Sequence, residues 1–469
     1  MKRAFKKKKR TPLTETYSPK IRAFAMTLNF YSAKAYRYVR KTFQLALPHP
    51  SSLRKWYQSI DGQPGFTQEA FSALSARVSK ASEENSKVVC ALMLDEMSIR
   101  KHIEWDGKKF LGYVDVGAET VNDDDDDAPV ATEVLVLMAV ALNSNWKIPL
   151  GYFLVHGLSG QEWANIVKNC LRRFHDTGVR TVSLTCDGPS CHFSMIEELG
   201  GKITPGDLQP WFWHPVDKTE KVHIVMDVCH MLKLVRNTIG QTGVIIDGAG
   251  GKVLWSYWEE LHKLRELEGL RLGKKLRGSH MQWEKQKMKV NLAVQTISAS
   301  VADAMQFCRD ELELPQFQDC ETTVNFIVTF DRLFDILNSR NPLGKGYKSA
   351  LRTSNQHIWR PFLQQIFDYI ANLKDATGTP LHQTRRKTPF LGFMLAILSV
   401  QNLFPSLVTD NTLSYLLTYK LSQDHLELFL SAVRSAEGSN NNPTARQFAA
   451  AYKRLLMCHE VKARGNCTP

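Results

Sequence analysis

The sequence predicts an α/β domain that is followed by a long helical block and preceded by a small helical module. Between residues 88 and 187, short apolar runs typical of strands alternate with loops and one amphipathic helix. From residue 228 to about 420 the apolar spacing becomes helical and strand signals vanish. The composition, 43% hydrophobic and 23% charged, is that of a globular chain. These patterns exclude a disordered, collagenous or membrane-spanning protein.

The positive charge of the chain is unevenly distributed. Lys and Arg number 60 against 47 Asp and Glu, for a formal net charge of +13, and seven of the cations lie in the first ten residues, MKRAFKKKKR. That segment has no apolar core, so it is not a secretory signal. We expect residues 1–15 to form a basic disordered arm that directs the chain to the nucleus or touches phosphates. A solvated tail is the plainer alternative.

Residues 16–85 predict the small helical module. Ser18, followed by a proline, can open one helix, and Ser32 can cap a second. Ser51 or Ser52 can cap a third. Lys and Arg residues interleaved with aromatic residues fit a helix-turn-helix that binds DNA and supports dimerisation. A generic three-helix bundle explains the same periodicity equally well.

Residues 86–226 predict the α/β part, with a sheet buried on both faces. Five aspartates at 123–127 fit a solvated loop better than a cation trap. The expected strands are 88–99, 110–117, 131–143, 148–155 and 180–187, and the one helix is 159–176. Residues 223–227 fit one more strand or the entry to a helix.

Residues 227–420 predict an all-helical block that includes a basic loop at 270–278. The expected helices are 254–267, 285–312, 322–338, 357–374, 388–402 and 411–420. Residues 421–469 then hold a last helix, at about 423–434, and a tail.

Acidic residues are the candidate catalytic groups. Asp95 and Asp187 each end an apolar strand, where a carboxylate costs desolvation energy unless a metal ion or a turn compensates it. If the two strands are neighbours, their ends lie close together. A two-metal site needs a third acid, and Glu427 is the candidate. It follows Asp424 by one helical turn, so both share a face, although a helical glutamate is usually solvated.

Cysteine and histidine residues do not form a zinc pattern. The tightest group lies at residues 186–192, and two more such residues follow at 229–230. No CxxC pair occurs, so a structural zinc site is not expected. The residues are Cys186, Cys191, His192, Cys229 and His230.

Five strings, in order from about Tyr17 to Tyr452, resemble the P-element family of DNA transposases, which includes the THAP-domain-linked transposases of animals. The strings are LDEMSIRK, TCDGPSCHFSM, DVCHMLKLVRN, FDRLFDILNSRNPLGKGYKSAL and SQDHLELFLSAVRSAEGSNNNPTARQF. The resemblance implies an RNase H-like catalytic domain with a mixed sheet, split between 86–226 and 421–469. It also implies a large all-helical GTP-binding insertion at 227–420 and a helix-turn-helix at 16–85.

The resemblance further implies a catalytic triad and its metals. Asp95 matches the first aspartate of the family, Asp187 the second, and Glu427 the late glutamate. Members cut and rejoin DNA with these acids and two Mg²⁺ (or Mn²⁺) ions. The 240 residues between Asp187 and Glu427 are then explained by the helical insertion.

In the family the insertion binds GTP as a cofactor for DNA synapsis. A carboxylate accepts hydrogen bonds from guanine and repels the corresponding lone pair of adenine, and a lysine suits phosphate. The string GKGYKS lacks the spacing of a phosphate-binding loop. In the resemblance, Asp227 matches the guanine-reading aspartate of the family and Lys233 its nearby lysine. Asp335 and Asn338 match a second pair of ligands, and Asp424 matches a third contact, which would couple the nucleotide to the active site. Lys252 and Val253 match further contacts through a looser alignment. In the plainer alternative, Asp335 and Asn338 are only polar groups at a helix end.

The sequence departs from the family before Tyr17, where no zinc-binding Cys/His pattern of a THAP domain occurs. A truncated or host-adopted transposase would have this organisation. We expect a nuclear, DNA-cleaving homodimer whose partners are double-stranded DNA (transposon ends and target) and GTP, with no membrane. A domesticated, non-catalytic DNA-binding protein derived from a transposase is the main alternative. A scaffold regulated by guanine nucleotide is a third.

Overall fold

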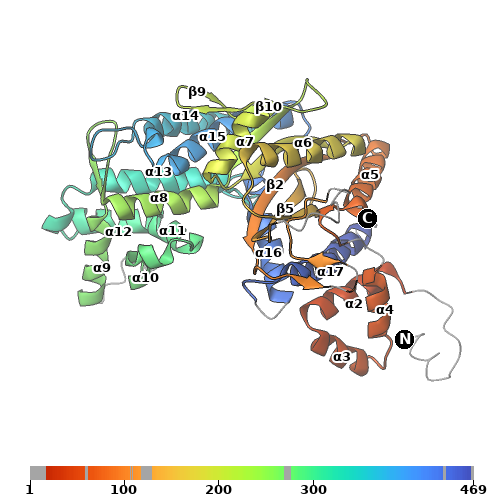
Figure 1. Cartoon of the computed structure of the whole chain (residues 1–469). Helices are drawn as coiled ribbons and strands as arrows, with labels where there is room; N and C mark the ends of the chain where they lie inside the picture. The colour runs from red at the N-terminus through yellow and green to blue at the C-terminus, as the bar shows by residue number, and fades with distance from the viewer. Residues whose placement is uncertain are drawn as a thin grey trace, which may run out of the picture. The chain divides into compact units, whose positions relative to one another are not determined.

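The computed structural model describes residues 17–58, 62–105, 107, 109–117, 129–268, 276–436 and 440–465 (Figure 1). The chain divides into two compact units. The first comprises Met1–Leu158, Asn169–Thr181 and Asp424–Pro469, and the second Ser159–Lys168 and Val182–Gln423. The basic arm 1–15, the aspartates 123–127 and most of the loop 270–278 lie outside the described residues.

The first unit begins with three helices, α2 (Pro19–Tyr31), α3 (Ala33–Thr42) and α4 (Pro50–Gln58). The hydroxyl oxygens of Ser18 and Ser32 accept backbone N–H groups of α2 and α3, so both predicted caps are confirmed. The third helix, α4, begins at Pro50, before the predicted caps Ser51 and Ser52, because the fixed φ of proline suits the first turn of a helix. Tyr36 anchors the module, since its buried hydroxyl donates to the Pro48 carbonyl at 2.6 Å.

Antiparallel strands form the core of the first unit, in the order β1-β6-β5-β2. Three predicted strands are confirmed. The predicted strand 110–117 was wrong: only Phe110–Leu111 (β4) is a strand, paired with Glu104–Trp105 (β3). Gly112 follows with φ +113, which turns the backbone out of the extended conformation. The bounds are β1 Gly65–Phe66, β2 Val89–Ser98, β5 Glu133–Ala141 and β6 Lys147–Val155.

Helices cover both faces of these strands. Successive strand residues point to opposite faces, so Tyr152 and Phe153 of β6 mark one face each. Tyr152 packs against Phe448 of α17, with ring centroids 5.1 Å apart. Phe153 packs against Phe66, which contacts Phe71 of α5. Helices α5 (Gln68–Glu83) and α17 (Ala445–Gly465), neither of which we predicted, therefore lie on opposite faces (Figure 1).

The second unit carries strands in the order β7-β11-β10. β7 (Arg180–Cys186) runs parallel to β11 (Lys221–Met226), and β10 (Trp211–Trp213) pairs antiparallel with β11, so this set is mixed. The first residues of β7 belong to the first unit, where Arg180 donates its N–H to Val88. Helix α6 (Gly160–Thr177) precedes β7, and α7 (Ser190–Leu199) and a hairpin, β8 (Lys202–Thr204) and β9 (Asp207–Gln209), follow it.

The helical block of the second unit differs from prediction at several places. Helix Val228–Thr242 (α8) was not among the expected helices. The expected helix 285–312 is broken, because Ile297 leaves the helical region and Ser298 is extended. The segment 411–420 holds only a 3₁₀ turn, Thr418–Leu421. A short hairpin, β12 (Val244–Ile246) and β13 (Lys252–Leu254), interrupts the helices. The helices are α8 Val228–Thr242, α9 Ser256–Glu268, α10 Gly278–Met281, α11 Val290–Thr296, α12 Ala299–Asp310, α13 Glu321–Leu337, α14 Gln356–Ala371 and α15 Lys387–Phe404.

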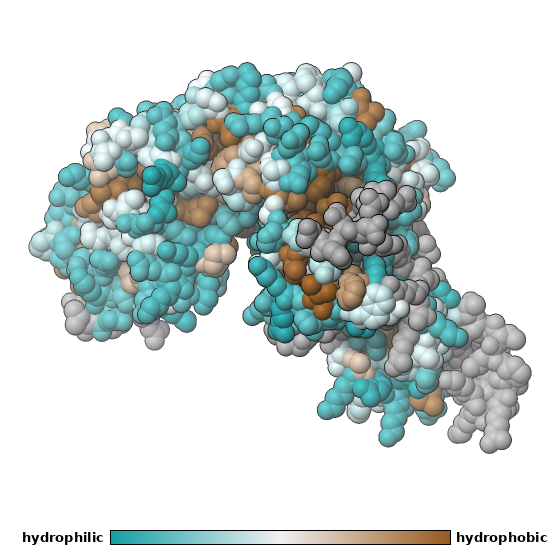
Figure 2. Space-filling model, viewed as in Figure 1, coloured by the Kyte–Doolittle hydropathy of each residue, from teal (hydrophilic) through white to brown (hydrophobic). Residues whose placement is uncertain are grey.

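Helix α15 is the core of the second unit. It packs against β11, α8 and α14. Gly392 allows the close approach, since a β-carbon there would collide with Met231 of α8. The segment Lys387–Thr409 is long and apolar enough to cross a membrane by length and composition, but 78% of it is buried inside the protein. That burial is typical of a core helix, and the outer surface over α9, α10 and α12 is mostly hydrophilic (Figure 2).

Candidate functional site

Asp95 lies inside β2, three residues before its end, rather than at the end as predicted, because Glu96 to Ser98 continue the pairing with β5. It is directly opposite Val136, which is opposite Tyr152. Opposite residues of antiparallel strands share a face. Since Tyr152 faces α17, half-buried Asp95 lies on the face that α17 covers.

Glu427 lies in the first turn of α16 (Asp424–Ala436). This helix packs against β2 and β5 and contacts α17, where Phe429 and Tyr452 have ring centroids 5.9 Å apart. The Lys147 ammonium of β6 donates to the His425 carbonyl at 3.3 Å and holds this first turn. The first unit therefore brings exposed Glu427 and Asp95 to the same side of its strands.

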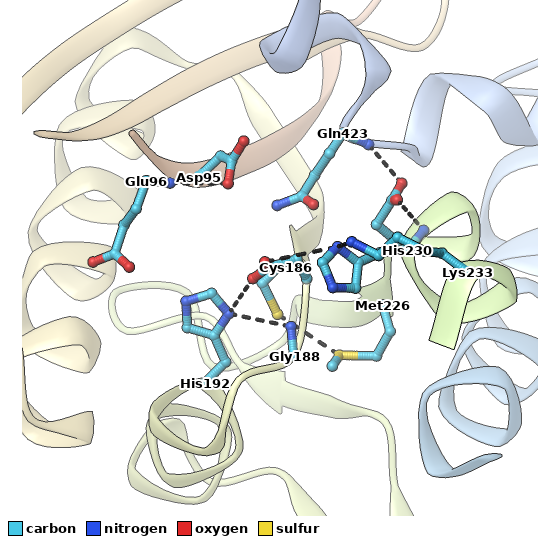
Figure 3. A network of polar contacts seen from close by, with 11 residues as sticks. Asp95, Glu96, Cys186, Gly188, His192, Met226, His230, Lys233 and Gln423 are labelled. Atoms are coloured by element: carbon cyan, nitrogen blue, oxygen red, sulfur yellow. Dashed lines mark hydrogen bonds and ion pairs between the residues drawn. The ribbon is translucent and has the colours of Figure 1, made fainter. Parts of the chain in front are cut away.

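Asp187 directly follows β7 and lies in the second unit. Its Oδ1 is 3.1 Å from Nδ1 of His192, and its Oδ2 is 3.9 Å from Nδ1 of His230 (Figure 3). Gly188, with φ +84, makes the turn that leads into α7 and returns the chain to Asp187. The side chain of Asp187 is 25% exposed, so one part of the carboxylate is held and another remains accessible.

The electrostatics of this cluster favour an ionised Asp187. Burial alone would raise the pKa of Asp187, but the hydrogen bond from His192 and the nearby histidines outweigh it and hold the pKa below its usual value. Burial and the neighbouring Lys233 lower the pKa of His230 to about 4. His230 is therefore neutral at neutral pH, and the cluster keeps one negative charge.

The chemistry of Asp95, Asp187 and Glu427 fits Mg²⁺ or Mn²⁺, which prefer carboxylate oxygens. Asp187 in particular is held as the anion that a metal ligand must be. Within the described ranges, no group of three or more His, Cys, Asp or Glu side chains is already gathered around one point for a metal ion. The structure thus supplies suitable ligands on β2, after β7 and on α16 without a preformed cluster.

Asp227 occupies a structural position. It is 1% exposed and caps α8, since its Oδ2 accepts the His230 N–H at 2.8 Å. Its Oδ1 accepts the N–H of Gln423 at 3.0 Å. Gln423 directly precedes Asp424, the first residue of α16. Asp227 therefore fixes the chain segment from which the helix of Glu427 starts.

Asp335 and Asn338, the second predicted pair of nucleotide contacts, lie beside the start of α8. Asn338 ends α13, and its amide donates to Sγ of Cys229 in the first turn of α8, at 3.9 Å. Asp335 lies on the preceding turn, with Oδ2 3.7 Å from the ammonium of Lys348. Burial raises the pKa of Asp335 to about 6, with Lys348 opposing the rise. Lys233, 4% exposed, also belongs to α8, which Asp227 caps. Four of the predicted residues, Asp227, Lys233, Asp335 and Asn338, therefore lie where α8 and α13 meet.

Lys252 and Val253 do not join them. Both lie on β13, whose Leu254 donates its N–H to Thr323 at the other end of α13. Twelve helical residues separate Thr323 from Asp335, which is about 18 Å along the axis. Val253 is also fully buried. The structure therefore separates these two residues from the other predicted nucleotide contacts.

The helical module presents cations on one stripe. Lys34, Arg37, Tyr38 and Lys41 of α3 are all exposed and follow the spacing of one helical face, while Tyr36 is buried on the other side. Tyr38 is 72% exposed. This stripe suits contacts with phosphate groups.

Sequence reasoning missed His192 and His230 as partners of Asp187 and Lys348 as the partner of Asp335. The group of Cys and His residues at 186–192 and 229–230 was visible, but only its zinc interpretation was weighed. The structure joins the two parts of that group around Asp187, and the thiol of Cys186 lies 3.7 Å from Sδ of Met226 (Figure 3).

Comparison with known protein families gives four matches that cover most of the chain. Residues 1–56 match the model of a transposable element P transposase-like HTH domain. Residues 62–200 match a TNP-like RNase H N-terminal domain, and residues 419–453 a TNP-like RNase H C-terminal domain. Between them, residues 229–350 match a TNP-like GTP-binding insertion domain.

Individual relatives agree with these matches. The chain is 34% identical over 446 residues to DNA transposase THAP9 of Homo sapiens, covering 94% of this chain and 48% of the relative. It is 24% identical over 439 residues to the transposable element P transposase of Drosophila melanogaster, covering 92% of this chain and 53% of the relative. The chain thus spans about half the length of these relatives.

A solved structure shares the fold. The Drosophila P element transposase strand transfer complex superposes with a TM-score of 0.76 at 22% identity, over 95% of this chain and 93% of that one. Together with the family matches, this shows RNase H-like halves interrupted by a GTP-binding insertion domain, which confirms the predicted fold class.

Proposed function

The chain belongs to the P-element-type transposase family, and we propose from this that it cuts and rejoins DNA through Asp95, Asp187 and Glu427. The carrying observation is the placement of an ionised Asp187 after β7, with Asp95 and Glu427 on one side of the strands of the first unit. In the proposed reaction water cleaves a phosphodiester and frees a DNA 3′-hydroxyl. That hydroxyl then attacks a target phosphodiester and displaces its 3′ oxygen.

In this proposal the three carboxylates hold a pair of Mg²⁺ or Mn²⁺ ions. The ions would supply charge neutralisation for the attacking and leaving oxygens. The chain itself contributes Lys147, which holds the first turn of α16 in the first unit, and Asp227, which binds the N–H of Gln423 in the second. It also contributes the low pKa of Asp187, which keeps that ligand ionised.

Nicking of supercoiled DNA in Mn²⁺ and GTP tests the proposal. Asp95→Ala, Asp187→Ala and Glu427→Ala should each abolish nicking and leave DNA binding largely intact. Asp176→Ala, an exposed acid on α6, is the control and should nick normally. Normal nicking by Glu427→Ala would remove that residue from the site. A wild-type chain that binds DNA but never nicks it would favour the domesticated, non-catalytic alternative.

We also propose that GTP binds where α8 and α13 meet, with Asp335 and Asn338 as direct contacts and Lys233 near the phosphates. The match to a GTP-binding insertion domain and the convergence of these residues support this. Asp335→Ala should weaken GTP binding in a filtration or calorimetric assay. Lys252→Ala is the informative comparison: unchanged affinity agrees with the geometry, and a loss would restore the contact that the family resemblance implies.

Guanine reading by Asp227 and coupling through Asp424 remain part of the proposal. Asp227→Asn should shift preference from GTP towards xanthosine triphosphate if the carboxylate reads the base. An unchanged preference would leave Asp227 only its role as the cap of α8. The same comparison with Asp424→Asn tests whether the first residue of α16 senses the nucleotide.

DNA is the proposed macromolecular partner, bound as double-stranded transposon ends and target by a nuclear homodimer. The helix-turn-helix match and the basic stripe of α3 support DNA contact. Replacing Lys34, Arg37 or Lys41 with Ala should each reduce the slope of log affinity against log salt by about 0.9 per lost phosphate contact. Unchanged slopes in all three variants would place the DNA contacts elsewhere.

A further inference from the structure

His192 is buried and makes a close contact with the carboxylate of Asp187. The imidazole is 1% exposed, and its Nδ1 lies 3.1 Å from Oδ1 of Asp187 (Figure 3). Nδ1 is also 3.4 Å from the N–H of Gly188. Because the carboxylate can only accept, Nδ1 carries the proton and donates to Asp187. The Gly188 N–H contact with the same nitrogen is longer than the contact with Oδ1, so the carboxylate is the closer partner of Nδ1.

The ring of His192 is held in place from outside the cluster. Trp163 of α6 packs on it edge-on, with centroids 4.7 Å apart and ring planes at 85°. Gly188 adopts φ +84, a conformation that other residues rarely adopt, so glycine favours the turn that brings α7 back. Backbone and packing therefore determine where Nδ1 points before any ligand binds.

The other ring nitrogen of His192, Nε2, indicates that the buried imidazole has a role beyond core packing. Nε2 of His192 is buried and has no hydrogen-bond partner among the described residues. A histidine that served only the core would be replaced without loss by an apolar side chain, because an unsatisfied nitrogen is unfavourable. Its one donated bond goes to Asp187. His230 does not share the task, since its Nδ1 is 3.9 Å from Oδ2, beyond hydrogen-bond distance.

We propose that His192 is a positioning residue: it holds Oδ1 of Asp187 so that Oδ2 is presented to a divalent cation. Hydrogen bonds to a ligating carboxylate orient it, and their loss typically costs about 10–100-fold in metal affinity. The inference rests on the proposed function, because it assumes that Asp187 is a metal ligand. It adds a residue that the triad does not contain.

Mn²⁺ titration followed by electron paramagnetic resonance tests the role without DNA cleavage. His192→Asn keeps a donor near the position of Nδ1, whereas His192→Gln carries its amide further along the ring, towards the position of Nε2. Both variants bury one amide, so their thermal stabilities should be alike. We expect His192→Gln to lose about 10–100-fold in Mn²⁺ affinity and His192→Asn to stay within about threefold of wild type. His230→Asn should change little.

Three outcomes distinguish failure of the metal function from failure of the positioning role alone. If Asp187→Ala leaves Mn²⁺ affinity unchanged, Asp187 is not a ligand, and both the metal function and the positioning role fail. If Asp187→Ala loses Mn²⁺ but His192→Gln and His192→Leu bind it as wild type does, only the positioning role is overturned. Equal losses in the Asn and Gln variants, with equal melting temperatures, also overturn it, because donor placement then has no effect.

Discussion

Replacing Asp227 with alanine removes the acceptor of two backbone hydrogen bonds at once. Oδ2 accepts the N–H of His230 and caps α8, and Oδ1 accepts the N–H of Gln423. Asp227 is 1% exposed and Gln423 2%, so water cannot readily take over. A buried donor left without an acceptor costs about 1–3 kcal/mol, and a lost helix cap about 0.5–2 kcal/mol. The first figure applies to the N–H of Gln423 and the second to the cap of α8, and the middle of their summed range gives an expected loss of about 2–4 kcal/mol.

Thermal unfolding and hydrogen exchange measure this loss. For a unit of this size the unfolding midpoint should fall by roughly 5–15 °C, and the Gln423 amide should exchange faster. Asp227→Asn should be intermediate, because one oxygen remains as acceptor while the amide NH₂ opposes the second donor. Asp368→Ala, at an exposed position on α14, should stay within about 0.5 kcal/mol of wild type. An Asp227→Ala chain that melts with the Asp368→Ala control, with unchanged exchange, would refute the reasoning.

Three further predictions concern stability. Burial raises the pKa of Asp335 to about 6, so the contribution of this carboxyl group to the free energy of unfolding is greatest below about pH 4 and is lost as pH rises through 6, by at most about 3 kcal/mol. In unfolding measured from pH 4 to 8, Asp335→Asn should lack this loss of stability, and a pH profile like that of wild type would contradict the prediction. Arg236→Ala should cost about 2–4 kcal/mol in denaturant unfolding, since the fully buried guanidinium donates to the Gln286 carbonyl, whereas a loss below 1 kcal/mol would show that the site relaxes. Tyr36→Phe should cost about 1 kcal/mol through its bond to Pro48, and a neutral result in thermal unfolding would mean that water replaces the bond.

Local signals predicted the elements whose own residues specify them. Ser18 and Ser32 cap helices because a serine oxygen reaches an N–H three residues on, which needs no distant partner. β2, β5 and β6 followed from runs of apolar residues long enough to be buried on both faces.

Elements that depend on distant contacts were missed or misplaced. Helix α17 follows a Gly/Asn-rich stop, after which the sequence predicts only a tail, although Phe448 and Tyr452 pack on Tyr152 of β6. The strand expected at 110–117 has the right residue types but meets a glycine with positive φ after two residues. The hairpin that carries Lys252 is too short to show a period of two.

The candidate site divides in the same way. Residue type and spacing single out Asp95, Asp187 and Glu427, and the family matches support the fold that carries them. Sequence could not show which face of its strand Asp95 lies on, or that Lys252 is a helix length from Asp335, since the first depends on strand pairing and the second on packing along α13.

By itself the sequence determined the long buried strands, most of the long helices and which acids are available for chemistry, because burial patterns and residue types are local properties. Only the tertiary structure decided which contacts each acid makes. Asp227 caps α8 and binds a backbone N–H 196 residues away, and Asp187 is held by a buried histidine that Trp163 orients. Hydrogen bonds between distant segments depend on where the chain folds back, and that position is set by packing, which no local pattern contains.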